Sequence, residues 1–155
     1  MKIWISIILF SLSLINADAF TFDQASPIRQ GVHVEWYRTV APSLDGSAIF
    51  VWSDTRYGVR NVFAHKIDKN GNFTWGDNGA VITNLPGRQE DPVAIEDGNG
   101  GAFIAWVDYR FDDSGDIFIQ HVNESGAIQM DPNGVALAQQ QGTQISINMC
   151  TDSLG

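Results

Sequence analysis

Short apolar runs alternate along the chain with turns rich in Gly, Asn and Asp, and this pattern predicts antiparallel β-strands. The run Ala102–Val107 (AFIAWV) is apolar at every position, so we expect both faces of that strand to be covered. Glycine-containing turns follow the predicted strands, as in β-hairpins. The strands expected in this part of the chain are Asp91–Glu96, Ala102–Val107, Asp116–Val122 and Ala127–Met130.

The same pattern of residues occurs twice. Residues 48–82 align with residues 102–137, at an offset of 54 residues that becomes 55 after one inserted residue. The matching positions are mainly turn glycines, aromatic residues and an Asp–Arg pair, which indicates a tandem repeat. The matched pairs are Trp52/Trp106, Asp54/Asp108, Arg56/Arg110, Phe63/Phe118, Gly71/Gly126, Gly79/Gly134, Gly87/Gly142 and Gln89/Gln144.

A unit of about 55 residues with four antiparallel strands, covered on both sides, is typical of a β-propeller blade. We therefore predict an all-β fold of tandem four-stranded antiparallel blades, that is, part of a β-propeller. A β-sandwich is the alternative, but its strands would not repeat at a fixed period.

Residues 20–155 are expected to hold about two and a half of these units. The last, incomplete unit opens with a predicted strand over Gln144–Met149, which lacks its hairpin partner, so we expect the sequence to be a fragment truncated at its C-terminus. The first unit is degenerate. Its echoes of the later unit are Pro42 with Pro92 and Asp45-Gly46 with Asp97-Gly98.

The repeat follows the pattern D-G-x-G-G-A-x-x-x-W-x-D-x-R, carried by Asp97–Arg110, then D-I-x-x-Q at Asp116–Gln120, then Gly126–Val135. It resembles a broad, mostly uncharacterised repeat of secreted bacterial proteins, which implies a propeller-type architecture. It is also distantly similar to the sialidase-type propellers with their Asp-box turn, S-x-D-x-G-x-x-W. Residues Asp68–Trp75 carry the Asp and the Trp of that turn, with one extra residue on each side of the Gly.

The first 19 residues have the features of a cleavable signal peptide. Lys2 gives a short positive region, Ile3–Ile15 is an apolar run, and Ala17-Asp18-Ala19 provides small residues at a cleavage site. The apolar run is shorter than the roughly 20 residues of a membrane-spanning helix. We therefore expect a protein that is secreted or displayed at the cell surface, without a membrane span after cleavage.

The net charge argues against one class of partner, and the cysteine content excludes an intrachain disulfide. The formal net charge of −9 repels phosphate backbones, so we expect no nucleic acid partner. Cys150 is the only cysteine, so an intrachain disulfide is excluded. It aligns with Ile95 in a predicted strand, and we interpret it as a buried small hydrophobic residue.

The repeated Trp-x-Asp-x-Arg element is the best-defined motif. Its Asp can accept backbone N–H bonds from the following loop, while its Arg pairs with the Asp or stacks on an aromatic ring. Alternatively, the Arg side chains could bind carboxylates or sugars on a rim. Because the motif occurs in each unit and an active site is needed once, we favour the structural interpretation. Its residues are Trp52, Asp54, Arg56, Trp106, Asp108 and Arg110.

An acidic loop, Asp108–Asp116, is a weak candidate for a Ca²⁺ site, since hard cations bind closely spaced carboxylates. The spacing D-x-D-x-D-G is absent, so a solvated charged loop is the alternative reading. The candidate ligands are Asp108, Asp112, Asp113 and Asp116. No other cofactor is indicated.

No catalytic constellation stands out. The chain lacks G-x-S-x-G, and its three histidines do not have the spacing of a zinc site. We therefore predict a secreted, non-enzymatic binding or scaffold module for a protein or glycan. The alternative is the N-terminal fragment of an extracellular glycan-processing hydrolase or lyase, with its site on the central channel of the propeller.

Overall fold

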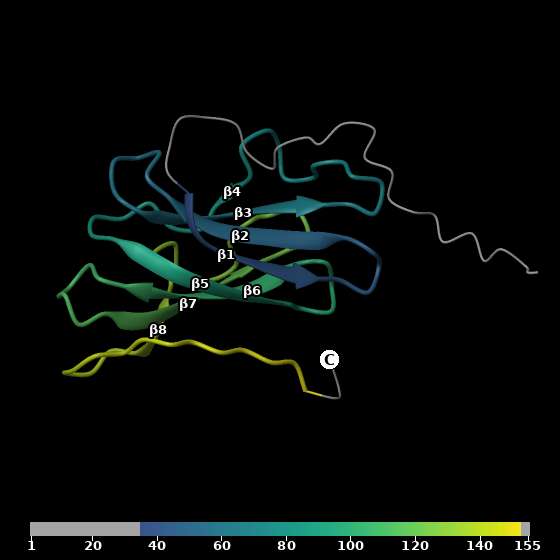
Figure 1. Cartoon of the computed structure of the whole chain (residues 1–155). Helices are drawn as coiled ribbons and strands as arrows, with labels where there is room; N and C mark the ends of the chain where they lie inside the picture. The colour runs from purple at the N-terminus through teal and green to yellow at the C-terminus, as the bar shows by residue number, and fades with distance from the viewer. Residues whose placement is uncertain (1–34, 153–155) are drawn as a thin grey trace, which may run out of the picture.

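The computed structural model of the chain describes residues 35–152. The predicted signal peptide, residues 1–19, lies outside the described residues. The described part consists of two four-stranded antiparallel sheets joined in sequence, so the all-β prediction is confirmed (Figure 1). No helix occurs between residues 35 and 152, and so none there could cross a membrane.

Each sheet is a simple meander whose strands pair in chain order. The first sheet contains β1 (Glu35–Pro42), β2 (Ala48–Asp54), β3 (Asn61–Ile67) and β4 (Ala80–Val81). The second contains β5 (Gln89–Glu96), β6 (Ala102–Asp108), β7 (Asp116–Val122) and β8 (Val135–Ala138).

The central strands are the most apolar and the most deeply buried. Six of the seven residues of β6 are buried, which confirms that this strand is covered on both faces. In both sheets the motif tryptophan lies opposite a phenylalanine of the next strand, as Trp52 opposite Phe63 and Trp106 opposite Phe118. The ring centroids are 6.3 Å apart in each pair, within the range of favourable aromatic contacts.

The turn that precedes β8 needs a glycine for two reasons. Gly134 has φ +77°, a conformation that L side chains rarely adopt. A Cβ at this position would also lie 2.6 Å from the Trp106 ring. The glycine of the Asn-Gly pair is therefore required in the second sheet by its backbone conformation and by close packing against the motif tryptophan.

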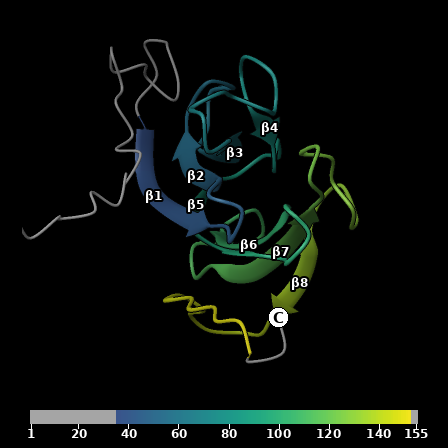
Figure 2. The ribbon, with the colours of Figure 1, turned by 90° about the vertical axis from the view of Figure 1, so that its right-hand side faces the viewer.

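The two sheets stack face to face and share one hydrophobic core (Figure 2). Strand β5 packs against β1 and β2 of the preceding sheet. Trp75, which is 6% exposed, donates from Nε1 to the Glu124 carbonyl oxygen of the second sheet at 2.8 Å. Its ring lies over Gly126, where a Cβ would come within 2.8 Å of it. One large side chain thus ties the first sheet to a turn of the second.

The prediction of the fourth strand was wrong in position. Ala127–Met130 contributes only an isolated bridge between Ile128 and Val122, and the strand that completes the sheet is β8. The first sheet repeats this arrangement, with a bridge between Phe73 and Ile67 ahead of β4. The tight turn after β7 brings Ile128 back for a single contact, and the chain then loops out before it pairs again.

Two expectations about the C-terminal part were also wrong. Residues 139–152 run as an extended segment below the second sheet, and Gln144–Met149 is not a strand (Figure 1). Within the described residues, the segment has no neighbouring hairpin with which to form a ladder. Cys150 is accordingly exposed, whereas its counterpart Ile95 lies in β5. The backbone amide of Gln144 nevertheless donates to the Gly115 carbonyl oxygen at 3.3 Å, just as the backbone amide of Gln89 donates to the Arg60 carbonyl oxygen at 2.8 Å.

The sequence matches proposed for the first unit do not agree with the strand pairing in the structure. Ala48 and Ala102 occupy matching places, and the residues opposite them are Pro42 and Glu96. Pro42 therefore corresponds to Glu96, while Pro92 lies within an irregularity of β5. By the same register Asp45 corresponds to Asn99 and Gly46 to Gly100, not to Asp97 and Gly98.

Candidate functional site

The Trp-x-Asp-x-Arg motif forms the same hydrogen-bonded arrangement at the end of β2 and of β6. Asp54 accepts hydrogen bonds from Trp52 Nε1 and from the Arg56 backbone amide, each at 2.9 Å. Asp108 accepts the equivalent bonds from Trp106 and from the Arg110 amide, again at 2.9 Å. Each carboxylate thereby fixes both the tryptophan and the start of the following loop.

The motif arginine completes each of these hydrogen-bonded sets of Trp, Asp and Arg, which we call braces. Arg56 Nη2 lies 2.6 Å from Asp54 Oδ2, and Arg110 Nη2 lies 2.5 Å from Asp108 Oδ2. The guanidinium carbons lie 3.7 Å from the ring centroid of Phe63 and 4.1 Å from that of Phe118, and both arginines are largely buried. Arg56 also donates to the carbonyl oxygen of Asn78, and Arg110 to that of Asn133. These contacts engage both guanidiniums inside the sheet ends and leave little of either for a ligand.

Asp54 is held in its ionised form. Burial raises the pKa of Asp54, but hydrogen bonds from Arg56 and Trp52 outweigh burial and bring the pKa below its ordinary value of 3.8. A carboxylate of this kind serves as a permanent acceptor rather than as a proton donor.

The four aspartates of the acidic loop have different surroundings. Asp108 is engaged by its brace, Asp112 accepts from the Ser114 amide at 2.7 Å, and the side chain of Asp113 is 98% exposed. Burial, followed by the charges of Asp112 and Asp108, raises the pKa of Asp116. Between residues 35 and 152 no three His, Cys, Asp or Glu side chains are grouped so that they could hold a metal ion.

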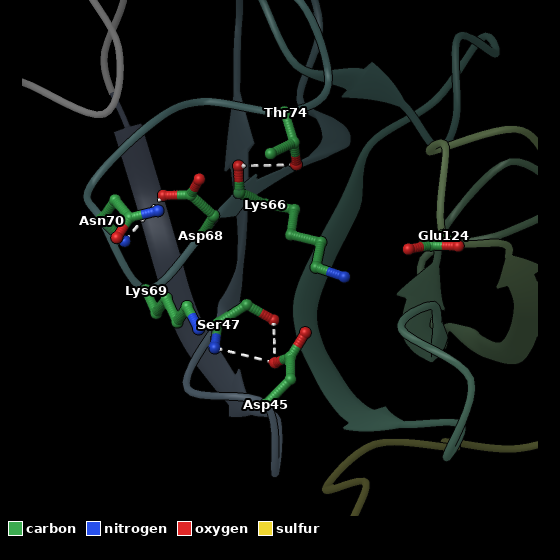
Figure 3. Close-up of a pocket in the computed structure, with 8 residues that line it drawn as sticks. All are labelled: Asp45, Ser47, Lys66, Asp68, Lys69, Asn70, Thr74 and Glu124. Carbon is green, nitrogen blue, oxygen red and sulfur yellow. Dashed lines mark hydrogen bonds between the residues drawn. The ribbon is translucent and has the colours of Figure 1, made fainter.

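A polar pocket of about 320 Å³ lies at the turn end of the first sheet, and we call it the turn-end pocket. Figure 3 shows its residues coming from the β1–β2 turn, the end of β3 and the turn after β3, with one residue from the second sheet. Every lining residue is polar or charged. They are Asp45, Ser47, Lys66, Asp68, Lys69, Asn70, Thr74 and Glu124.

Lys66 is the unusual member of this lining. Its side chain is only 4% exposed, and it extends from β3 toward the second sheet, from which Glu124 comes (Figure 3). Nζ donates to the Gly100 carbonyl oxygen at 2.8 Å, its single hydrogen bond within residues 35–152. An ammonium group has three donors, so a buried one with a single acceptor retains unused donor capacity beside the pocket.

The two aspartates of the pocket are shaped by their own turns. Asp45 Oδ1 accepts from both the amide and the hydroxyl of Ser47, at 2.8 and 2.6 Å. Asp68 Oδ1 accepts from the amides of Asn70 and Asn72, each at 2.8 Å. These hydrogen bonds, from Ser47 on Asp45 and from Asn72 above all on Asp68, lower the pKa of both carboxyls below 3.8. Both are therefore charged acceptors at neutral pH.

A second cavity, of about 390 Å³ and with a mixed polar and apolar lining, lies where β1, β5 and the extended segment near residue 146 meet. We call it the first-strand cleft. It is lined by Arg38, Asp91, Pro92, Val93, Tyr109, Ile145, Ser146 and Ile147. A larger and more apolar cavity of about 620 Å³ lies along later residues of the same three segments, and its lining includes Ala41, Ile95 and Cys150.

The residues that distinguish these cavities were not identified from the sequence. Lys66 stands where the second unit has His121, and Arg38 and Asp91 belong to first strands whose register was not recognised. The scarcity of lysine was an available signal, because Lys66 and Lys69 are the only lysines after Lys2. The side chains gathered in each cavity come from segments far apart in sequence, which the repeat alignment does not bring together.

Comparison of the chain with protein families, with curated proteins and with solved structures finds no match.

Proposed function

We propose that the mature protein is a secreted binding module of the β-propeller type, which takes a glycan in the turn-end pocket. Two successive sheets with the same strand order stack face to face, and their first strands lie next to each other, which is the arrangement expected of neighbouring blades. The predicted signal peptide supports an extracellular location.

The observation that supports a glycan as the ligand is the wholly polar lining of the pocket around Lys66. The pocket combines two ammonium groups, three carboxylates, one amide and two hydroxyls. Donors and acceptors are thus mixed, with no apolar side chain among the lining residues. A polyhydroxyl ligand suits such a surface, because each sugar hydroxyl can donate to a carboxylate and accept from Lys66.

Two of the three carboxylates of the pocket are unsuited to glycan hydrolysis. Hydrolysis of a glycosidic bond requires one carboxyl group with a raised pKa to act as the general acid. Asp45 and Asp68 have lowered pKa values, so both are ionised at neutral pH. They can accept hydrogen bonds from a bound sugar but are poor proton donors to a leaving group.

The test is a glycan array probed with the full-length secreted protein, followed by calorimetric titration with the best oligosaccharide. Lys66→Met keeps the length and apolar stem of the side chain and removes the ammonium, so affinity should fall at least about tenfold, the loss of one charge-assisted hydrogen bond. Glu124→Gln, at an exposed position that leaves folding unaffected, should weaken binding as well. Arg38→Met, outside the pocket, is the matched control and should bind the glycan like the wild type.

Two results would overturn the proposal. One is the absence of any saturable glycan binding by a folded protein. The other is oligosaccharide binding that neither Lys66→Met nor Glu124→Gln changes. Specific binding of a peptide or protein by the same pocket would replace the ligand class and keep the site.

A further inference from the structure

The first-strand cleft contains two strained residues at equivalent positions. Asp91 has φ +49° and Ser146 has φ +69°, and they are the only non-glycine residues with positive φ in residues 35–152. They lie 55 residues apart, which is the repeat offset, and both line the cleft. Non-glycine residues in this region carry a conformational cost, and such residues cluster at ligand-binding positions.

The strain at Asp91 coincides with an irregularity of the sheet. The pairing of β5 with β6 shifts between Glu90 and Val93, so Asp91 stands outside the regular ladder. A bulge of this kind redirects a side chain relative to its neighbours. Asp91 lines the cleft at this irregularity.

Arg38, on the facing strand β1, has no ion pair among the described residues. Of the arginines in residues 38–152, Arg56, Arg60, Arg88 and Arg110 all form ion pairs with carboxylates. Arg38 forms none, and its side chain is exposed at the cleft. Asp91 is likewise without an ion pair or side-chain hydrogen bond in the described structure, although it is partly buried. Within the described residues, the cleft therefore contains a guanidinium that can bind an anion and a carboxylate that can accept hydrogen bonds.

We infer that the first-strand cleft binds a small ligand that carries a carboxylate and, on the neighbouring carbon, a hydroxyl or an ammonium group. The carboxylate would pair with the Arg38 guanidinium, whose planar fork matches carboxylate geometry. The neighbouring donor would bond to the Asp91 carboxylate, and the apolar side chains of Pro92, Val93 and Ile147 would contact the carbon skeleton. The cavity volume lies at the lower end of the range for small-molecule sites.

The electrostatics of Asp91 agree with this role. Burial, and then the nearby Glu90 charge, raise the pKa of Asp91, while the Arg60 charge acts in the opposite direction. A partly desolvated carboxylate without a donor gains free energy when a ligand supplies one. The cleft shares no lining residue with the turn-end pocket, so this inference stands apart from the proposed glycan binding.

Three probes of nearly equal size distinguish the possible ligand classes. L-Alanine carries an ammonium beside its carboxylate, L-lactate carries a hydroxyl there, and propionate carries neither. Titration of the full-length protein, followed by two-dimensional NMR, should show saturable shifts at the cleft with alanine or lactate and weaker binding of propionate. The better of the first two identifies the ligand class.

Two variants tie the binding to the two side chains. Arg38→Met should reduce the affinity for the better probe about tenfold or more, because it removes the carboxylate's partner. Asp91→Asn keeps an acceptor oxygen but loses the charge, so it should reduce alanine binding more than lactate binding. Asp77→Asn, at an exposed position that lines neither cavity, should leave both affinities unchanged. The inference is overturned if no probe shows saturable binding, or if Arg38→Met binds as the wild type does.

Discussion

At the scale of single residues, the braces at the ends of β2 and β6 are the most fully determined feature of the protein. A short carboxylate can accept from a tryptophan two residues before it and from an amide two residues after it, because all three lie at one strand end. The adjacent arginine supplies the countercharge that a buried carboxylate needs. Trp-x-Asp-x-Arg therefore reads as a unit that joins a strand to its loop.

Asp54→Asn should be destabilising in a pH-dependent way. The pKa of Asp54 is depressed in the folded state, so its contribution to stability is complete well above 3.8 and is lost as the pH falls through the lower folded-state pKa. We expect Asp54→Asn to lower the free energy of unfolding by about 3 kcal/mol at neutral pH, because Arg56 loses its charged partner in a buried site. Urea unfolding should show this difference shrinking toward pH 3.

Asp113→Asn is the control for this experiment, since the Asp113 side chain is 98% exposed. It should change the free energy of unfolding by less than about 0.5 kcal/mol at either pH. A deficit of Asp54→Asn that stayed the same from neutral to acid pH would show that the brace does not depend on the charge of Asp54.

At the scale of elements, the sequence was sufficient to locate the central strands of each sheet and insufficient to locate the fourth strand at its edge. Strands β6 and β7 are bounded by clear turns, and their apolar patterns located them. The repeat alignment then placed β2 and β3 at the equivalent positions of the first sheet. The fourth strand was ambiguous, because Ala127–Met130 and Val135–Ala138 are both short and partly apolar. Which one pairs depends on the conformation of the intervening turn, where Gly134 packs under Trp106.

Trp75→Ala should be among the most destabilising substitutions between the sheets. The indole is 6% exposed, bonds to the Glu124 carbonyl oxygen and covers Gly126 of the second sheet. Its removal leaves a cavity between the sheets, and we expect a loss of about 3 to 5 kcal/mol in the free energy of unfolding. Thermal denaturation of the full chain measures it. Met130 occupies the equivalent place in the second sheet and is only half-buried, so Met130→Ala should cost about 1 kcal/mol. Equal costs for the two substitutions would contradict the assigned role of Trp75.

At the scale of the whole molecule, the cavities were beyond sequence reasoning because they depend on how the sheets are placed against each other. Lys66 belongs to β3, and the carbonyl oxygen that binds its ammonium belongs to Gly100, 34 residues later in the next sheet. Arg38 and Ser146 are separated by most of the described chain, yet they line one cleft. Periodicity identifies which residues repeat, and the functional candidates here are mostly residues that depart from the repeat.

The same view of the whole molecule leads to a prediction about residues 144–152. Gln144 makes the backbone contact to the second sheet that Gln89 makes to the first. The proposed blade architecture therefore predicts that this segment can serve as the first strand of a further sheet. Joining a second copy of residues 101–155 directly after Gly155 keeps the repeat register and supplies the next hairpin. Because repeat stability grows with each added interface, the extended protein should melt at a higher temperature. Hydrogen–deuterium exchange should show new protection of the amides of residues 144–152, whereas a scrambled extension of equal composition should give none. An extension that folds but leaves these amides unprotected would contradict the blade-by-blade architecture.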